Sequence, residues 1–377
     1  MKIPFQDYSY LNKRLKKELL IEINQILNSP DNSSHRVYTE EFEKEFADYC
    51  NTRFAIGVDS GTTALQLALA ASGIKQGDEV IIPAYTYIAT ALAVSNLGAK
   101  PIFADIKEED LTIDPSLIEK RITNKTKAVI PVHMHGNPCD MDVILDICNN
   151  HNLKLIEDAS QAHGASYKKK KIGSFGIGCF SLHTSKTLGG TGDAGIITLD
   201  NEEIWKKIRQ LRVPDNNSKN ILLSKRTPCD IDAIQAAIIK VKLPYLDKFN
   251  KRKNEIAALY DSFLDYTKIK KITPCENSYP VYRDYCIKTT NLEKLNQFLF
   301  NNRIKTKVRY KIPLHLTKTF SYLGYKVNDC PIAEKAAKEV LCLPSFIGIT
   351  NEEIKSVCEC INRFEASKKS DVSKLKS

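Results

Sequence analysis

Residues 178–195 read Gly-Cys-Phe-Ser-Leu-His-Thr-Ser-Lys-Thr-Leu-Gly-Gly-Thr-Gly-Asp-Ala-Gly, and the rest of the chain is organised around them. Residues 177–182 alternate as a strand does, and the residues after Lys186 are too rich in glycine to form a helix. Lys186 is therefore expected at the mouth of a sheet, where burial would lower the pKa of its amine and favour attack on a carbonyl carbon. The alternative is a solvated loop lysine, since the chain holds 55 Lys and Arg residues.

Two further stretches supply an acid and an anion site. Leu153 begins a short apolar strand that ends in Glu157 and Asp158, and carboxylates at the C-terminal edge of a strand can point into a crevice. Residues 59–63, Asp-Ser-Gly-Thr-Thr, precede an apolar helical run, so hydroxyl groups and free amides lie at a helix N-terminus that stabilises an anion. A nucleophilic lysine, an acid able to keep a pyridine nitrogen protonated and a phosphate site are what pyridoxal phosphate requires of a protein.

Helix and strand patterns alternate along the chain, which predicts a doubly wound α/β domain with a mostly parallel sheet. The expected helices are 62–72, 87–97, one that begins after Asp114, and 142–150, and the expected strands are 80–83, 101–105, 128–132, 154–157, 177–182 and 195–199. A smaller α/β pattern follows the helical run 245–263. We expect a large cofactor-binding domain at 1–250, which includes the N-terminal helix, a small C-terminal α/β domain at 251–366 and a disordered polar tail at 367–377.

Five local signals refine this outline. Residues 11–27 have helical spacing, and Thr39 is expected to begin the next helix. Residues 213–225 lose periodicity and are expected to form a polar loop. A strand is expected at 306–308, and a capping box of Thr350 with Glu353 is expected to open the last helix.

Composition and residue spacing argue against a membrane, secreted, nucleic-acid-binding or metal-binding protein. No apolar run approaches the ~18 residues of a membrane span and no secretory leader is seen, so a cytoplasmic protein without a membrane partner is expected. The 11 scattered cysteines are typical of a reduced protein. A net charge of +10 suggests anionic ligands, and without a basic arm a nucleotide-linked small molecule is expected rather than nucleic acid. Cys358-x-Cys360 and His133-x-His135 have no further ligand nearby in the sequence, so no metal site is expected.

These motifs together resemble the sugar aminotransferases of the DegT/DnrJ/EryC1/StrS family, within the aspartate-aminotransferase-like superfamily (fold type I) of pyridoxal-phosphate enzymes. The resemblance covers nearly the whole chain. Each piece is short, but their order and spacing are specific. The pieces are Ile3-Pro4-Phe5, Ser60-Gly61-Thr62, Pro83-Ala84-Tyr85-Thr86-Tyr87, Pro131-Val132-His133, Glu157-Asp158-Ala159-Ser160-Gln161-Ala162-His163-Gly164, Ser185-Lys186 and Ile312-Pro313-Leu314-His315.

The resemblance implies a role for each cofactor-site residue. Lys186 would be the catalytic Schiff-base lysine, and Asp158 the catalytic acid against the pyridine nitrogen, with Glu157 facing away along the strand. The alternative for Asp158 is an exposed strand-end acid or a helix cap. Gln161 would contact the ring hydroxyl, although its amide could instead only satisfy a turn. Ser60, Gly61 and Thr62, with Ser181, would bind the phosphate, although Ser-Gly-Thr could also be a plain helix start. Tyr87 would lie on the ring face, with Tyr85 as the competing choice.

The resemblance further implies that glutamate is the amino donor and that a nucleotide-linked keto-deoxysugar is the acceptor, in amino-sugar biosynthesis. Arg309, Tyr310 and His315 lie in the stretch that would approach the sugar nucleotide, and Lys307 with Arg309 could meet its diphosphate. A solvated basic edge is the alternative interpretation of this stretch.

A homodimer with shared active sites is also implied by the resemblance. Many relatives carry an Asn-x-Arg turn through which the second subunit contacts the cofactor phosphate, whereas this chain has Pro228-Cys229-Asp230 there. Pro228 lacks an amide donor and Asp230 would repel a phosphate. We therefore expect Lys225 or Arg226 to reach the partner's cofactor instead.

Two other functions compete with transamination. A cofactor-dependent sugar dehydratase of the same fold is disfavoured, because that branch of the family replaces the lysine that stands here as Lys186. A non-catalytic nucleotide-sugar-binding regulator would be expected to have lost Lys186 or Asp158, or to have gained a DNA-binding domain, and the sequence has neither feature.

Overall fold

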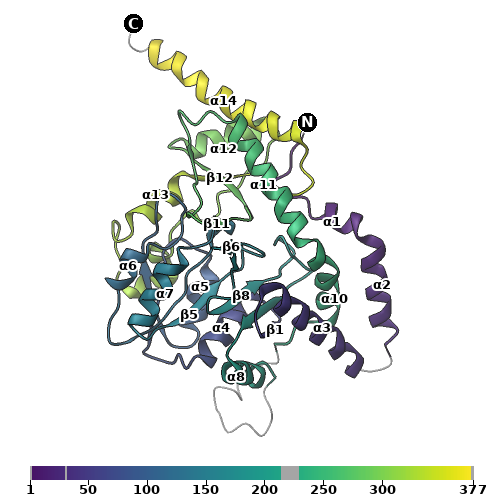
Figure 1. Ribbon diagram of the computed structural model, residues 1–377. Helices are drawn as coiled ribbons and strands as arrows, with labels where there is room; N and C mark the ends of the chain where they lie inside the picture. Colours follow the sequence, from purple (N-terminus) through teal and green to yellow (C-terminus); the bar gives the residue numbers. More distant parts are fainter. Residues whose placement is uncertain (1, 30–31, 214–228, 375–377) are drawn as a thin grey trace.

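A seven-stranded sheet forms the centre of the large domain in the computed structural model, which describes residues 2–29, 32–213 and 229–374 (Figure 1). Its strand order is β1-β9-β8-β5-β4-β2-β3. From β8 to β3 neighbouring strands are parallel, and β9 is antiparallel to both β8 and β1, which confirms the mostly parallel sheet. The strands are β1 Phe54–Val58, β2 Glu79–Pro83, β3 Lys100–Ala104, β4 Thr126–Val129, β5 Lys154–Asp158, β8 Ile177–Ser181 and β9 Gly195–Leu199.

Helices cover both faces of this sheet. Alternation along β2 divides its side chains between two cores: Val80 and Ile82 pack in the core that contains α4, and Ile81 packs in the core that contains α3 and α7. These strands are apolar on both sides because both sides are covered. The helices are α3 Asn32–Cys50, α4 Gly61–Ala71, α5 Ile88–Ser95, α6 Pro115–Glu119, α7 Met141–Asn150 and α8 Glu202–Arg212.

Helix α10 packs against both α3 and α2 and leads through α11 toward the small domain (Figure 1). The helical pattern predicted at 11–27 divides into α1 (Ser9–Arg14) and α2 (Lys16–Leu27). The prediction that Thr39 begins a helix is wrong, because α3 begins upstream at Asn32 and the Thr39 hydroxyl donates to the Arg36 carbonyl, 2.8 Å away. Helix α10 is Ala233–Lys242, and the short turn η2 (Leu243–Tyr245), which contains Pro244, connects it to α11 (Leu246–Phe263).

The small domain is a three-stranded antiparallel sheet, β10-β12-β13, packed against helices. Ile3 near the N-terminus belongs to its core and bridges Ile304, and helix α11 extends across the predicted boundary at 250. The elements are β10 Lys270–Lys271, β12 Tyr285–Lys288, α12 Leu292–Asn301, η3 Leu314–Leu316, η4 Lys318–Leu323, α13 Pro331–Glu339, β13 Val340–Leu343 and α14 Asn351–Lys374. A third small sheet, β11-β6-β7, is formed by Ser278–Tyr279, Ser166–Tyr167 and Lys170–Lys171.

The other local predictions differ in their outcomes. The capping box is confirmed, since the Thr350 amide donates to Glu353 at 2.9 Å and the Glu353 amide donates to Thr350 at 3.1 Å. The strand predicted at 306–308 is wrong, because only Lys307 forms a bridge, with Cys342. Helix α14 (Asn351–Lys374) continues into the stretch 367–377, for which a disordered tail was predicted. The predicted loop 213–225 lies almost entirely outside the described residues.

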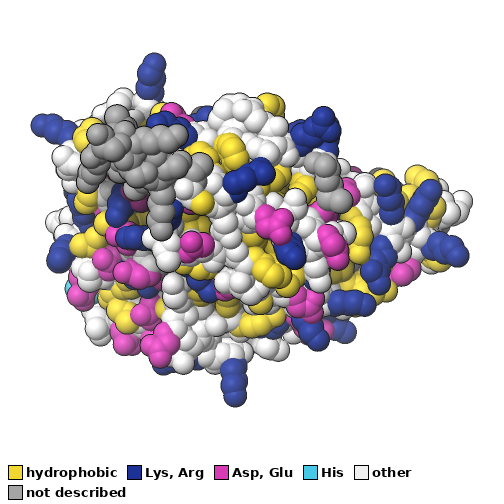
Figure 2. Space-filling model, turned by 90° about the horizontal axis from the view of Figure 1, so that it is seen from above, with side chains coloured by type: hydrophobic (Ala, Val, Ile, Leu, Met, Phe, Trp, Pro, Cys, Tyr) yellow, Lys and Arg dark blue, Asp and Glu magenta, His cyan; other side chains and the backbone are white. Residues whose placement is uncertain are grey.

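The surface carries both signs of charge. On the face shown in Figure 2, Lys and Arg side chains are interspersed with Asp and Glu, as expected for a solvated surface. Among the described helices, none has the length and apolar character that would let it cross a membrane.

Candidate active site

A cavity of about 450 Å³ opens at the carboxyl ends of β5 and β8, the edge at which open α/β sheets bind ligands. Its volume is within the range of about 300–1,000 Å³ that is usual for small-molecule sites. Every predicted site residue except His315 lines it. The lining includes Ser60, Gly61, Thr62, Tyr87, Asp158, Gln161, Ser181, Lys186, Arg283, Lys307, Arg309 and Tyr310.

Lys186 lies in a turn just after β8, partly buried at this cavity. Its backbone amide donates to the His183 carbonyl at 2.8 Å, which fixes the turn. Burial and, after it, the neighbouring Arg283 guanidinium lower the pKa of the Lys186 amine to about 7, although Asp158 opposes the shift. Lys186 therefore lies just beyond the end of β8, at the mouth of the sheet, and is partly buried there.

Asp158 and Glu157 end β5 and face opposite ways. The Asp158 carboxylate accepts a hydrogen bond of 2.8 Å from the Thr90 hydroxyl and one of 3.2 Å from the Ser160 amide, and it lines the cavity. Glu157 is fully buried and accepts from three backbone amides, at 2.8–2.9 Å, those of Gly173, Phe175 and Gly176. Because side chains alternate along a strand, Asp158 points into the cavity, whereas Glu157 points the other way and binds backbone amides.

A small cradle is formed where the N-terminus of α4 approaches the end of β8. Ser60 caps the helix, and its Oγ accepts from the Thr63 amide at 3.2 Å. Gly61 packs so closely on Ser181 that a Cβ at position 61 would lie 2.6 Å from the Ser181 Cβ. The absence of a side chain thus lets α4 direct its positive end, with the Ser181 hydroxyl, at the cavity.

The two candidate tyrosines differ in burial, and the predicted amide residue is held by hydrogen bonds. Tyr87 lines the cavity and is 60% exposed, whereas Tyr85 is fully buried and packs edge-to-face on Tyr310, with ring centres 5.2 Å apart. Tyr87 is therefore the residue that the cavity presents. Gln161 accepts from the His135 amide at 3.1 Å and donates to the Tyr310 hydroxyl at 3.3 Å, so it is held in place by the protein.

A cluster of cations forms another part of the lining. Arg309 makes a bidentate contact with Asp284, with Nε–Oδ2 3.0 Å and Nη2–Oδ1 2.5 Å, and Arg283 contacts the same carboxylate at 2.6 Å. Together the two guanidinium groups hold the pKa of Asp284 well below its usual value despite complete burial. Arg283 and Asp284 were missed from the sequence. They directly precede β12, and only the packing of the small domain brings them to Lys186.

Two histidines differ from the sequence prediction. His315 is not brought to the cavity: it is fully buried in η3, where its Nε2 lies 3.1 Å from Glu334 of α13. His163 was not assigned a role, yet its Nε2–H donates to the Ser181 carbonyl at 2.9 Å. Burial and the nearby Lys186 lower the pKa of His163 to about 3, so it is a neutral support for the strand that carries Ser181.

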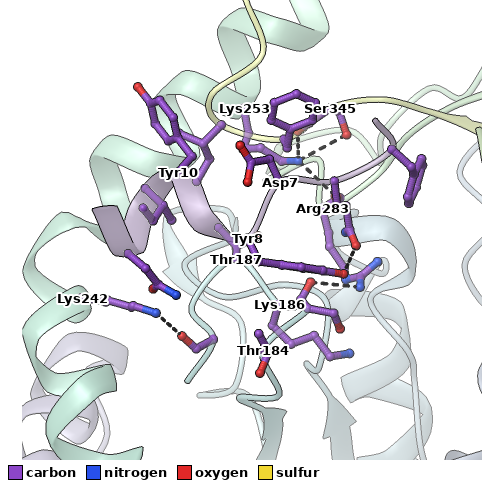
Figure 3. A pocket seen from close by; sticks show the side chains of 18 of the residues that line it. Asp7, Tyr8, Tyr10, Thr184, Lys186, Thr187, Lys242, Lys253, Arg283 and Ser345 are labelled. Atoms are coloured by element: carbon purple, nitrogen blue, oxygen red, sulfur yellow. Dashed lines mark hydrogen bonds between the residues drawn. The ribbon is translucent and has the colours of Figure 1, made fainter. Parts of the chain in front are cut away.

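A smaller cavity, of about 80 Å³, reaches Lys186 from beneath the N-terminal segment. Figure 3 shows Arg283 beside Lys186, below the segment that carries Asp7 and Tyr8. Lys242 donates to the Gly189 carbonyl at 2.7 Å and thereby braces the glycine-rich loop.

The residues present fit pyridoxal phosphate. The cradle between Ser60 and Ser181 depends on the missing side chain of Gly61 and offers hydroxyl and amide donors, which suit a phosphate. Asp158 supplies an oriented carboxylate and Lys186 a primary amine with a lowered pKa in the same cavity. This donor set matches what the cofactor needs of a protein.

Comparisons with known proteins agree with this geometry. Residues 13–362 match the DegT/DnrJ/EryC1/StrS aminotransferase family. The chain is 37% identical to a Streptomyces venezuelae dTDP-3-amino-3,4,6-trideoxy-alpha-D-glucose transaminase over 91% of both chains. It is also 37% identical to the dTDP-3-amino-3,6-dideoxy-alpha-D-galactopyranose transaminase of Aneurinibacillus thermoaerophilus, over 96% of this chain and 99% of that one. The crystal structure of S. venezuelae DesV in complex with a ketimine intermediate has a TM-score of 0.91 and 35% identity, over 96% of this chain and 98% of DesV.

Proposed function

The chain belongs to the DegT/DnrJ/EryC1/StrS aminotransferase family and is a pyridoxal-phosphate-dependent aminotransferase, and from this premise we propose that it moves an amino group from glutamate to a nucleotide-linked keto-deoxysugar. The product would be a nucleotide-linked amino sugar. One observation carries the proposal: the same cavity is lined by Lys186, by Asp158 and by the three cations Lys307, Arg309 and Arg283.

The protein would hold the cofactor through residues at or just beyond the carboxyl ends of β5 and β8 and at the N-termini of α4 and α5. Ser60, Gly61, Thr62 and Ser181 would take the phosphate, Asp158 the pyridine nitrogen, Gln161 the ring hydroxyl and Tyr87 the ring face. When bound, pyridoxal phosphate supplies an electron sink for the negative charge that develops at the carbon bearing the amino group.

Lys186 would hold and move the proton in this reaction. Its pKa of about 7 makes both the ammonium and the free amine accessible near neutrality, which suits one group that acts first as base and then as acid. The Thr90 hydroxyl and the Ser160 amide keep the Asp158 carboxylate oriented toward the cavity, so the anion does not have to reorganise during the reaction.

Arg283, Lys307 and Arg309 would bind the anionic parts of the substrates. Arg309 uses one edge of its guanidinium on Asp284, and this contact fixes the direction of the group. A diphosphate and a glutamate carboxylate are both anions that such groups bind well. Tyr310, held by its contact with Gln161, would shape the sugar side of the cavity. The cations therefore favour a nucleotide-linked sugar over a neutral one.

We also propose a homodimer in which each subunit completes the site of the other. Lys225, Arg226 and Pro228, which the sequence singled out for this contact, lie outside the described residues. Asp230 is described, and Arg212 Nε lies 2.6 Å from its Oδ1, so its charge is already paired within its own subunit. Sedimentation should give a dimer. Mixing inactive Lys186→Ala with inactive Lys225→Ala/Arg226→Ala should restore part of the activity, since one hybrid site would be intact, and a fully active monomer would contradict the proposal.

The substrate is tested with nucleotide-linked 3-keto and 4-keto sugars, each incubated with glutamate and the cofactor-loaded enzyme. The expected result is one acceptor that gains an amino group, read by product mass, with matching formation of 2-oxoglutarate. Lys186→Ala serves as the control for the uncatalysed reaction. Loss of a hydroxyl from the sugar without amination would favour the dehydratase alternative, and binding without turnover would favour the regulator.

A further inference from the structure

A second cluster of reactive side chains lies between the two domains, outside the cofactor site. It consists of His135, from the single-turn helix η1 (Met134–Gly136) of the large domain, and of Cys286 on β12 and Cys342 on β13 of the small domain. One imidazole nitrogen and the two sulfur atoms lie within 4.8 Å of one another. All three side chains are at least 95% buried.

The backbone brings the two thiols together. Cys286 and Cys342 are directly opposite each other in the antiparallel pair β12–β13. The amide and carbonyl of Cys342 both bond to Lys307, on the other side of β13, so the cysteines form a pair without hydrogen bonds between them, in which side chains lie closest. Their sulfur atoms are 3.1 Å apart.

The backbone also brings His135 to the thiols. His135 has a left-handed conformation, with φ 56°, a strain that non-glycine residues adopt mostly at turns and sites. The next residue, Gly136, passes so close to the segment that precedes β12 that a Cβ there would lie 2.9 Å from Val281 Cγ2. These two features place the imidazole beside the thiols of β12 and β13.

The hydrogen bonds of His135 leave one nitrogen free for a ligand. Nδ1 lies 3.3 Å from Asp284 Oδ2, whereas Nε2 is buried and has no hydrogen-bond partner among the described residues. A carboxylate that accepts from one ring nitrogen of a histidine while the other faces a metal is the usual arrangement around zinc ligands. A buried unpaired nitrogen is otherwise costly.

We propose that His135, Cys286 and Cys342 form a zinc site that joins the small domain to the large one. Two sulfur ligands and one imidazole suit Zn²⁺, which takes Zn–S distances of about 2.3 Å and Zn–N distances of about 2.0–2.1 Å. The fourth position is open to water or to Tyr85, which lies in the same core and whose hydroxyl has no partner among the described residues. The site was missed from the sequence because its ligands are about 150 and 56 residues apart, without ligand spacing.

The charges around the cluster permit a cation. Arg283 and Arg309 are nearby, but both are paired with Asp284, which is the acceptor for His135 as well. When Zn²⁺ binds, each thiol releases one proton to solvent, so two positive charges leave as two arrive and the net charge of the cluster does not change. The metal would fix His135, and through it the Asp284 carboxylate that directs the cavity arginines.

The test uses the full-length, cofactor-loaded protein, supplied with zinc and then desalted. The expected result is one retained zinc per chain, with two sulfur ligands and at least one nitrogen by X-ray absorption at the zinc edge, a signal that the cofactor does not obscure. Cys342→Ala and Cys286→Ala should each abolish stoichiometric retention. Cys358→Ala, which removes a buried thiol of α14, should leave retention unchanged. Asp284→Asn should weaken zinc affinity by about 10–100-fold.

Three results would overturn the zinc site. They are a wild-type protein that retains no zinc after desalting, bound zinc without sulfur ligands, and a Cys286–Cys342 disulfide, seen as a mass lower by two hydrogen atoms, in protein purified without oxidant. Each of these is measured on wild-type protein, so the conclusion does not depend on whether the variants fold. None of them bears on transamination, which the keto-sugar assay tests separately.

Discussion

Lys186 and Lys253 are two lysines with the same lowered pKa in opposite surroundings. Burial lowers the pKa of each to about 7. The Lys253 amine, on α11, donates to the Arg283 carbonyl at 3.1 Å and to the Ser345 hydroxyl at 3.3 Å, and also contacts the Ser345 carbonyl (Figure 3). The Lys186 amine has no such acceptor among the described residues and lines the main cavity.

The comparison teaches that a lowered pKa does not by itself identify a reactive lysine. All three donor positions of Lys253 are used to hold α11 against the segments before β12 and after β13. This amine therefore stabilises the packing of α11 and is not free to react. Lys186 keeps its nitrogen for a ligand. The following predictions test whether this division of roles is correct.

The largest effect is expected from Lys186→Ala. Product formation should fall by about 10³-fold or more, because no amine remains to attack the cofactor carbonyl or move the proton. Borohydride treatment of the loaded wild-type enzyme should fix the cofactor on the Lys186 peptide, read by mass. Label on the Lys253 peptide, or full activity in Lys186→Ala, would reverse the assignment of the two lysines.

Asp158→Asn should have the next largest effect, lowering turnover by about 10²–10³-fold while the cofactor stays bound. The amide keeps the shape but not the negative charge against the pyridine nitrogen. Ser60→Ala is the matched change at the phosphate cradle, and it should mainly raise the dissociation constant of the cofactor, measured by dialysis and absorbance. Normal turnover in Asp158→Asn would mean that another residue is the pyridine partner.

Lys253→Met should act on stability and not on chemistry. The buried oxygens of Arg283 and Ser345 would lose their donor, which costs about 1–3 kcal/mol of unfolding free energy, measured by urea denaturation. Lys251→Met, at an exposed lysine two residues earlier on α11, is the control and should be within about 0.5 kcal/mol of wild type. If Lys253→Met lost its borohydride label on Lys186 while remaining folded, the two lysines would not be independent.

The sequence was sufficient to predict which residues line the cavity where those residues end a strand or follow one closely. Asp158, Lys186 and Ser60 each follow or end a strand, and the periodicity that predicts a strand also predicts which residue leaves it at the cavity edge. The mostly parallel order followed from alternating helix and strand patterns in the same way. The sequence could not decide whether Tyr87 or Tyr85 lines the cavity, and only their burial in the structure distinguishes them.

The parts that sequence did not predict depend on contacts between distant segments. Arg283 and Asp284 carry no pattern of their own, and they reach Lys186 only because the small domain docks there. His315 was misplaced because its short motif does not show that the side chain turns inward to Glu334. Likewise, Thr39 was an acceptable helix start in isolation, but the helix had already begun.

The smallest effect concerns how pH controls the Lys186 amine. In cofactor-free enzyme, labelling of Lys186 by an amine-acylating reagent should rise with pH, reach half its maximum near pH 7 and then level off, because only the neutral amine reacts. Arg283→Gln should move the Lys186 midpoint to higher pH, since the guanidinium that disfavours the ammonium is removed. Lys253 should stay unlabelled across the range, because its amine is buried and its donors are occupied. A Lys186 midpoint near pH 10, or labelling of Lys253 at the rate of Lys186, would remove the distinction between the two lysines.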